Sequence, residues 1–170
     1  MKKYELTSET KVINGVELYR IKAIESFGSV GKGDLGGWIE SEKNLSQDGN
    51  AWVGENAMVY ENAIVAGNST VIGNAFISGN ATVSGYATVS GNAWVEGNAT
   101  VIGNADYIVF KNWWSSGRYF TWTRSNNKWK VGCFYGSGEE LIAKAYKDSE
   151  KSGREYERIV KYVNDILKEE

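Results

Sequence analysis

The sequence predicts a mainly β protein whose centre is a parallel β-solenoid. From Asn50 onward the chain reads as ten consecutive six-residue units without an insertion: NAWVGE, NAMVYE, NAIVAG, NSTVIG, NAFISG, NATVSG, YATVSG, NAWVEG, NATVIG and NADYIV. The second residue is alanine in nine units, and the fourth is valine or isoleucine in nine. A strict short period indicates stacked turns of equal size, because an ordinary antiparallel sheet needs turns of varying length.

The second and fourth residues of each unit are expected to face the interior. They lie two apart, so on a short strand they share one face. One β-branched and one very small side chain suit a narrow prism. Glycine at the sixth position and asparagine at the first tolerate positive φ and suit the corners. Upstream, Leu45 is in phase but Gln47 does not suit a core, so we expect the repeat to decay before Asn50 and the first coil to be irregular.

This unit resembles the repeat of the hexapeptide-repeat superfamily, and the resemblance covers residues 50 to 109. Proteins of that superfamily fold as a left-handed parallel β-helix with three units in each triangular coil. The resemblance therefore implies a left-handed solenoid of a little over three coils within residues 50–110. Tyr107 would take the fourth position of the tenth unit.

A coil of three units stacks outward side chains into columns, and one column is strongly apolar. It contains Met58, Phe76 and Trp94, each at the third position of its unit. Exposed apolar stripes on soluble proteins usually meet a partner, and members of the superfamily are commonly trimers. We therefore expect an oligomer interface at these three residues, with a homotrimer favoured. The alternative is that the C-terminal helix or flanking segments of the same chain cover the column.

Residues 1–49 are expected to form an N-terminal hairpin and a capping segment. Asn14-Gly15 lies between alternating apolar runs, which is a strong hairpin signal. The glycine-rich stretch from Gly31 to Trp38 lacks the Gly-Lys-Ser/Thr ending and the following helix of a phosphate-binding loop. We expect a turn there that feeds the chain into the solenoid and caps its open end.

Residues 111–170 differ sharply in composition. Between 111 and 136 there are five basic residues, eight aromatic residues and no acidic residue, whereas residues 50 to 110 hold four acids and no base. Tyr119–Arg124 and Lys128–Phe134 flank Ser125-Asn126-Asn127, which predicts a second hairpin. Two helices are expected, at 139–149 and 153–168, the second with its apolar residues on one face.

The interleaved rings and cations of this region suit base stacking and phosphate binding. We expect the following residues to bind a ligand or partner: Trp113, Trp114, Arg118, Tyr119, Trp122, Arg124, Trp129 and Lys130. The alternative is that most of the aromatic residues form a small core between the hairpin, the solenoid end and the helices. Five basic residues disfavour extended nucleic-acid binding, because its affinity scales with the phosphates neutralised. A small anionic nucleotide or an acidic protein surface fits the charge better.

The chain contains no histidine. Acyltransferases of the hexapeptide-repeat superfamily use a histidine base, and the related γ-class carbonic anhydrases hold a metal with histidines. Both mechanisms that the resemblance implies therefore lack their essential residue, and we predict no catalytic residue, no metal and no cofactor. A carboxylate can replace the base in principle, and Asp34, Glu55, Glu61, Glu96 and Asp106 are available. A histidine-independent acyltransferase-like enzyme is therefore kept as an alternative.

The two ends of the chain carry a second resemblance. Gly33 to Glu42, the Gly132-Cys133-Phe134-Tyr135-Gly136 step and the terminal helical pair are similar to segments of phage- and prophage-encoded hexapeptide-repeat proteins. In that setting we expect a non-catalytic oligomeric protein that counteracts a host defence by binding a host protein or sequestering a nucleotide signal. A structural or virion-associated solenoid module is the alternative.

Cysteine content and termini indicate the setting. Cys133 is the one cysteine, so no intrachain disulfide is possible, and we expect the cytoplasm of a bacterial host, with the thiol itself buried. The N-terminus shows no signal peptide, and no apolar stretch approaches the length of a membrane span, so no membrane partner is expected. The net charge of −2 gives no strong electrostatic bias.

Overall fold

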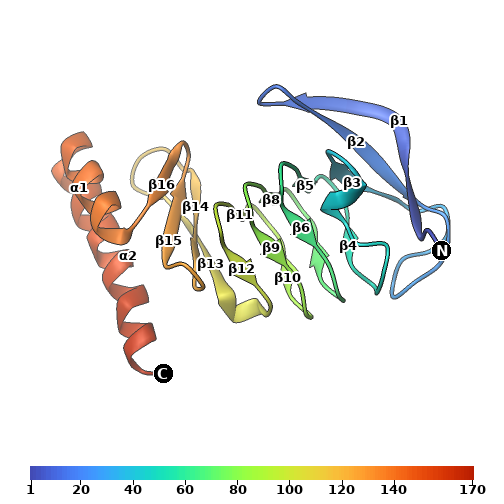
Figure 1. Ribbon diagram of the computed structural model, residues 1–170. Helices are drawn as coiled ribbons and strands as arrows, with labels where there is room; N and C mark the ends of the chain where they lie inside the picture. The colour runs from blue at the N-terminus through green and yellow to red at the C-terminus, as the bar shows by residue number, and fades with distance from the viewer.

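The computed structural model describes all 170 residues and shows an elongated, mainly β chain with two helices at its C-terminal end (Figure 1). A long N-terminal hairpin, a β-solenoid, a four-stranded sheet and the helix pair follow one another in chain order. No helix is both long enough and apolar enough to cross a membrane.

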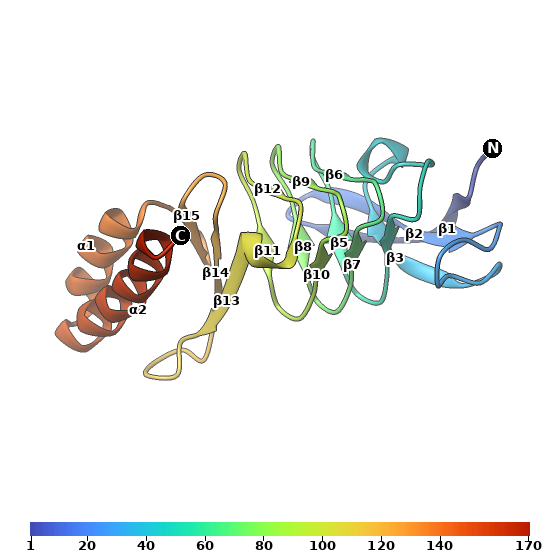
Figure 2. The ribbon, with the colours of Figure 1, turned by 90° about the horizontal axis from the view of Figure 1, so that it is seen from below.

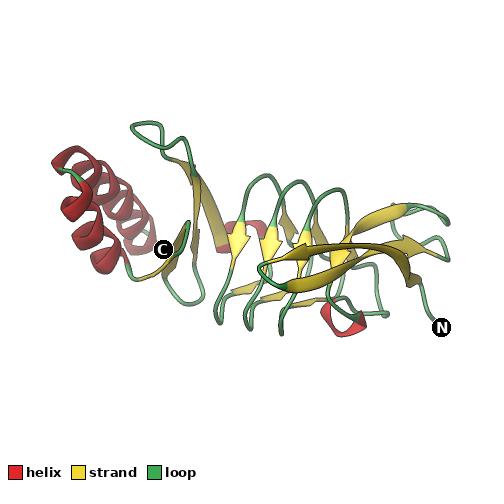
Figure 3. Cartoon of the chain, turned by 90° about the horizontal axis from the view of Figure 1, so that it is seen from above, coloured by secondary structure: helices red, strands yellow, loops and turns green.

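The N-terminal strands are continuous with one face of the solenoid. β1 (Tyr4–Ile13) and β2 (Val16–Ala23) pair antiparallel across Asn14-Gly15, whose φ angles of 51° and 80° are those that such a turn requires. β3 (Leu35–Ile39) pairs antiparallel with β2 and parallel with β5 (Met58–Val59). The resulting sheet has the order β1-β2-β3-β5-β8-β11, and the hairpin extends along the solenoid (Figure 3).

Nine two-residue strands form the regular solenoid, and strands three units apart pair in parallel. They are β4 (Trp52–Val53), β5 (Met58–Val59), β6 (Ile64–Val65), β7 (Thr70–Val71), β8 (Phe76–Ile77), β9 (Thr82–Val83), β10 (Thr88–Val89), β11 (Trp94–Val95) and β12 (Thr100–Val101). The register joins residues one coil apart, such as Met58 and Phe76. The prediction of three units per coil is therefore confirmed, and β3 adds an irregular first coil to give about four turns.

The interior of the prism is as narrow as the repeat predicts. Every second-position residue from Ala51 to Ala99 and every fourth-position residue from Val53 to Val101 has no solvent exposure. Ser69 replaces one alanine, and its hydroxyl donates to the carbonyl oxygens of Ala66 (2.7 Å) and Val83 (3.2 Å). The one polar residue of the repeat core is therefore hydrogen bonded, as burial demands.

The corners of the prism depend on backbone with positive φ at the sixth position. A Cβ at Gly73, where φ is 72°, would lie 2.9 Å from the amide nitrogen of Gly91 in the next coil. Glutamate takes this position twice, at Glu55 and Glu61, where φ is 54° and 58°. Each glutamate accepts the amide proton of the glycine one coil further on, at 2.7 and 2.6 Å respectively. Its carboxylate thus gives the corner a hydrogen bond that glycine lacks.

Outside the paired strand residues, the backbone hydrogen bonds between the coils run in one direction. The amide of Trp52 donates to the carbonyl of Ser69, that of Thr70 donates to Ala87, and the pattern repeats through the stack. The N-terminal end of the solenoid therefore presents mainly carbonyl oxygens without donors, and the C-terminal end presents mainly amides without acceptors. A buried polar group without a partner costs about 1–3 kcal/mol, so the segments at the two ends must supply opposite chemistry.

Donors close the N-terminal end. The ammonium of Lys3 donates to the carbonyl oxygens of Asp48, Gly49 and Ala51 at 3.3, 3.1 and 2.9 Å. It also lies 4.9 Å from the centre of the Phe27 ring. Lys3 is only 4% exposed, and hydrogen bonds from all three ammonium protons compensate for this burial.

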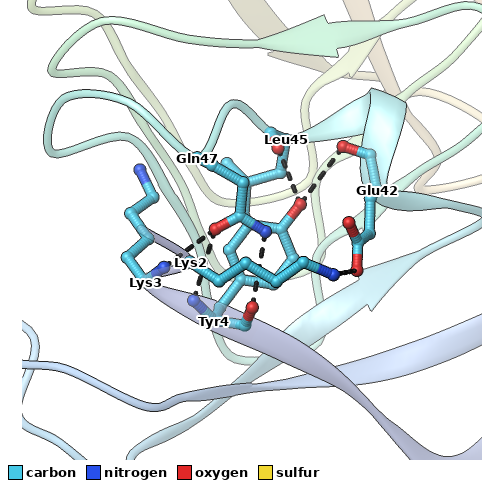
Figure 4. Close-up of polar contacts among 6 residues, drawn as sticks. All are labelled: Lys2, Lys3, Tyr4, Glu42, Leu45 and Gln47. Carbon is cyan, nitrogen blue, oxygen red and sulfur yellow. Dashed lines mark hydrogen bonds and ion pairs between the residues drawn. The ribbon is translucent and has the colours of Figure 1, made fainter.

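A tyrosine and a glutamine complete this end (Figure 4). The hydroxyl of Tyr4 bonds to the carbonyl oxygen of Leu45 at 2.7 Å. Gln47 accepts the amide proton of Lys3 at 2.9 Å and donates to the carbonyl of Tyr4. Leu45 is fully buried, whereas Gln47 serves the cap instead of the core, so the expected irregularity of the first coil is confirmed.

Acceptors close the C-terminal end. Six amides of the last coil donate to side-chain oxygens from the segment that follows: Thr88 to Asn104 Oδ1 (2.8 Å), Ser90 to Tyr107 Oη (3.3 Å), Trp94 to Thr121 Oγ1 (2.9 Å), Thr100 to Ser125 Oγ (2.8 Å), and Ile102 and Gly103 to Asp106 Oδ2 (both 2.8 Å). Side chains thus take the place of the next coil's carbonyls, and the stack stops.

The C-terminal region is an antiparallel sheet covered by two helices. Its strands are β13 (Tyr107–Lys111), β14 (Tyr119–Thr123), β15 (Lys128–Val131) and β16 (Phe134–Gly136), in that order, and its helices are α1 (Gly138–Asp148) and α2 (Glu150–Lys168). Short 3-10 turns at Glu42–Asn44 and Asn104–Asp106 flank the regular coils. Sheet and helices enclose a second apolar core that is separate from that of the solenoid.

Two structural elements differ from the sequence-based predictions. The tenth unit leaves the prism, because Asn104 and Asp106 cap the last coil and Tyr107 begins β13. The stretch predicted as a turn from Gly31 to Trp38 ends in β3, where a Cβ at Gly36 would lie 2.6 Å from the carbonyl oxygen of Val53. Glycine there permits close stacking of the first coil on the second.

Cys133 is exposed, which corrects the prediction of a buried thiol. It lies in the tight connection between β15 and β16, directly after Gly132, whose φ is 57°. A turn residue of this kind projects from the sheet, whereas its neighbours Val131 and Phe134 pack partly against the second core. The sequence around Cys133 reads as a continuous strand and hides this turn.

We expect Thr121→Val to destabilise the protein by about 1–3 kcal/mol, because it leaves the amide of Trp94 without an acceptor at a residue only 1% exposed. Urea unfolding measures the change. Thr82→Val is the matched control, since Thr82 lies on an outer solenoid strand, and a surface change of this kind is worth about 0.5 kcal/mol or less. Equal effects of the two substitutions would show that the side-chain cap does not stabilise the stack.

We expect Lys3 to make the protein more stable as the pH rises above about 8. Burial lowers the pKa of its ammonium from 10.5 to about 8, and nearby Asp48 partly opposes the shift. Between these two values the unfolded chain binds more protons than the folded one, so the free energy of unfolding increases with pH. The neutral amine keeps two N–H donors for the carbonyls.

Urea unfolding from pH 7 to about 9, roughly one unit below the ordinary pKa of tyrosine, tests this expectation. Lys3→Met should remove the increase, while Lys2→Met, at the exposed neighbouring residue, should retain it. The same pH dependence in wild type and Lys3→Met would contradict the assignment.

Candidate functional site

Three of the predicted binding residues belong to the second core. Trp114, Trp122 and Trp129 are 9%, 1% and 1% exposed, and they pack with Phe120 and Tyr156 between the sheet and the helices. The indole nitrogen of Trp122 donates to Asn127, and that of Trp114 donates to Ser152. This placement agrees with the alternative of a small aromatic core, and it leaves these three rings no face for a ligand.

Two of the predicted cations are held in ion pairs. Lys130 is buried and its ammonium lies 2.6 Å from a carboxylate oxygen of Glu96, a solenoid residue. Arg124 pairs with Glu170 near the C-terminus, and one of its two hydrogen bonds is 3.0 Å long. Both contacts join parts of this chain to one another, so both cations are already engaged within the fold.

Of the remaining three predicted residues, Trp113 and Arg118 lie on the loop between β13 and β14, which projects from the molecule (Figure 2), and Tyr119 follows as the first residue of β14. Trp113 is 69% exposed and Tyr119 is 43% exposed. Lys151 lies 5.7 Å from the ring centre of Trp113, and Lys111 lies 5.6 Å from that of Tyr119. Arg118 is exposed and makes no ion pair. We call residues 112–119 the aromatic-basic loop.

A cleft of about 390 Å³ opens beside this loop. Its polar lining consists of Asn112, Ser115, Ser116, Arg118, Lys144, Asp148, Ser149 and Ser152, and its apolar lining includes Val131, Phe134, Leu141 and Ala145. The loop supplies one wall, and α1 and the start of α2 supply the other. We call this space the helix cleft.

The helix cleft is fixed by contacts beneath it. The buried side chain of Asn112 donates to the hydroxyl of Tyr156 at 3.2 Å and accepts the amide proton of Ser115 at 2.9 Å. Burial raises the pKa of Tyr156, so its hydroxyl stays protonated near neutral pH. Ser149 caps α2 by accepting the amide proton of Ser152 at 3.0 Å. The loop, the sheet and the helix start are therefore held together before any ligand binds.

The predicted apolar column is present, but its own chain covers much of it. Met58, Phe76 and Trp94 stack in parallel register, and the rings of Phe76 and Trp94 lie 5.2 Å apart. Met58 is only 7% exposed because it packs with Leu18 of the hairpin. At the other end, Lys130 lies 4.3 Å from the ring centre of Trp94. Flanking segments thus cover both ends of the predicted oligomer interface.

Each carboxylate that the sequence offers as a substitute base has a structural contact. Glu55 and Glu61 accept corner amides, Asp34 accepts the amide of Gly31 at 2.8 Å, and Asp106 accepts two amides at the end of the solenoid. Glu96 pairs with Lys130. The structure also holds no group of three or more His, Cys, Asp or Glu side chains that could bind a metal ion.

Comparison with known proteins supports the solenoid. The family model described as YdcK Beta solenoid repeat matches residues 75–91, about one coil. No curated protein matches the chain. The match agrees with the coil formed by β8, β9 and β10.

We expect Phe76→Ala to destabilise the folded chain without changing its mass in solution. Loss of a large buried ring typically costs about 3–5 kcal/mol, and the partial exposure of Phe76 should reduce this. Light scattering measures the mass and thermal unfolding measures the stability of the wild type and of Phe76→Ala. Thr82→Ala, in a neighbouring column, is the control. An oligomer that dissociates into a folded monomer of unchanged stability would instead establish the column as a subunit interface.

Proposed function

We propose that this protein is a non-catalytic binding protein that takes a small anionic ligand, a nucleotide foremost, at the aromatic-basic loop and the helix cleft. The observation that carries the proposal is the pairing on one loop of a tryptophan that is 69% exposed with an arginine that has no carboxylate partner. A bare indole is costly to leave in water and is typical of a contact residue.

The chemistry of this region matches that ligand class. Every base has a π-face that can stack on a ring such as Trp113. An arginine such as Arg118 binds phosphate through two parallel hydrogen bonds. The hydroxyls of Ser149 and Ser152 line the adjoining cleft as further donors, next to the amide end of α2. The loop would thus stack on the base of a nucleotide, and the cleft would bind its phosphate.

The contacts of the five candidate carboxylate bases support a binding protein without catalytic activity. All five candidate carboxylate bases already contact backbone amides or Lys130, and the chain has no histidine. An acyltransferase-like reaction would require one of these acids to give up its structural contact. We propose in addition that the solenoid is left-handed, because its repeat resembles that of the hexapeptide-repeat superfamily. This handedness is compatible with a binding protein and with an enzyme.

An acidic protein surface is the second candidate partner. The observation in its favour is the cation near each exposed ring, Lys151 at Trp113 and Lys111 at Tyr119. In the phage setting that the sequence resemblance implies, either form of binding would oppose a host defence, by sequestering a nucleotide signal or by covering a host protein. A virion-associated module would need no such exposed ring.

Calorimetric titration with cyclic and linear nucleotides tests the proposal. Trp113→Ala and Arg118→Gln should each weaken binding by about tenfold or more, since one lost stacking or charged contact is worth roughly 1–3 kcal/mol. Arg158→Gln is the matched control, because Arg158 pairs with Glu155 on an exposed face of α2.

Two results would contradict the proposal. One is the absence of heat with every nucleotide together with acyl transfer from coenzyme A. The other is nucleotide binding that survives both substitutions. If an acidic protein is recovered from a bacterial lysate and its capture depends on Trp113, the macromolecular alternative is correct and the small-ligand proposal is wrong.

A further inference from the structure

A second cleft lies on the opposite side of the β15–β16 turn from the helix cleft, and three distant parts of the chain build it. Its volume is about 390 Å³. The hairpin tip contributes Asn14 and Val16, the solenoid contributes Tyr60, Glu61, Ser78, Trp94 and Glu96, and the C-terminal sheet contributes Lys130, Gly132 and Cys133. Its size is within the range of ligand sites. We call it the junction cleft.

The base of the junction cleft contains a buried charge that its protein partner does not fully satisfy. The side chain of Lys130 is 9% exposed, and its ammonium has one carboxylate partner, Glu96 at 2.6 Å. An ammonium has three N–H donors and a carboxylate has two acceptor oxygens. Lys130 therefore keeps donors, and Glu96, which is 29% exposed, keeps acceptor capacity, side by side in the cleft.

Neutral hydroxyl groups surround this ion pair. Ser78 is 2% exposed and its hydroxyl accepts the indole proton of Trp94 at 3.4 Å. Tyr60 is 3% exposed and lines the cleft together with Ser78 and with Asn14 of the hairpin tip. Burial raises the pKa of Tyr60, which keeps the phenol protonated. The cleft thus offers donors and acceptors close together and a single cation.

The geometry excludes the ligand proposed for the aromatic-basic loop. The ring centre of Phe76 lies 5.2 Å from that of Trp94, and the ammonium nitrogen of Lys130 lies 4.3 Å from the ring centre of Trp94. Little of this ring is left for a base to stack on. Two carboxylates, Glu61 and Glu96, face the cleft against one ammonium, so a phosphate would meet net repulsion.

We infer that the junction cleft binds a neutral polyhydroxylated molecule, in practice a monosaccharide unit. A hydroxyl both donates and accepts, so two adjacent hydroxyls can donate to Glu96 and accept from Lys130 at once. Tyr60 and Asn14 provide further polar contacts, while Val16 and the indole edge of Trp94 cover the C–H face. The inference is independent of the nucleotide site, since the two clefts share Cys133 alone.

Saturation-transfer NMR with a panel of neutral monosaccharides at millimolar concentration tests the inference on the full chain. The key variant is Lys130→Met with Glu96→Gln, because removing both charges leaves neither one buried without its partner. The matched control is Arg124→Met with Glu170→Gln, which removes another ion pair of the same C-terminal region. Val16→Trp narrows the cleft from the hairpin and keeps both charges, in case the first variant does not fold.

At least one sugar should bind the wild type, and its affinity should fall by about tenfold or more in the ion-pair variant and in Val16→Trp. The Arg124 control and Arg118→Gln should bind the sugar as the wild type does. The inference is wrong if no neutral sugar binds the wild type, if binding survives in both cleft variants, or if phosphate binds at this cleft instead. Loss of nucleotide binding in Arg118→Gln, with sugar binding intact, would separate the two sites.

Discussion

The predominant direction of the hydrogen bonds between coils is the constraint on which the rest of this structure depends. A solenoid of stacked two-residue strands ends mainly in unpaired carbonyls on one side and mainly in unpaired amides on the other. Lys3 and Tyr4 bring donors to the first end, while Thr121, Ser125 and Asp106 bring acceptors to the second. The hairpin and the C-terminal sheet are thus required by the solenoid and are not appendages to it. Their positions, once set, create the two clefts.

The C-terminal region shows how one cluster of aromatic residues serves two purposes. A sheet of four short strands and two amphipathic helices needs a core, and Trp114, Trp122 and Trp129 provide it. Trp113 is adjacent in sequence to Trp114 yet points to solvent on the projecting loop. The distinction matters for function, because a buried indole stabilises the fold and an exposed one is available for recognition. The proposed nucleotide site therefore contains three of the eight residues that sequence reasoning selected.

The two clefts differ in chemistry although they adjoin the same turn. Arg118 has no acidic partner and lies beside serine hydroxyls, which suits an anion. Lys130 is committed to Glu96 and has Glu61 nearby, which suits a neutral ligand rich in hydroxyls. Equal volume therefore does not imply equal ligands, since the pairing of each cation decides what it can still attract. No signal in the sequence indicated the junction cleft, because its walls come from residues more than one hundred positions apart.

The sequence by itself determined the solenoid, since alanine at the second position and valine at the fourth leave one way to bury a period of six. It also determined both hairpin turns, the helix pair and the stacking of Met58, Phe76 and Trp94, all of which follow from local spacing. Tertiary structure alone decided which side chains are exposed. Whether Trp113 or Trp114 faces water, whether Lys130 is free, and whether Cys133 lies in a strand or a turn depend on contacts with distant segments. Composition cannot reveal these contacts, because the same residue types serve as core and as surface.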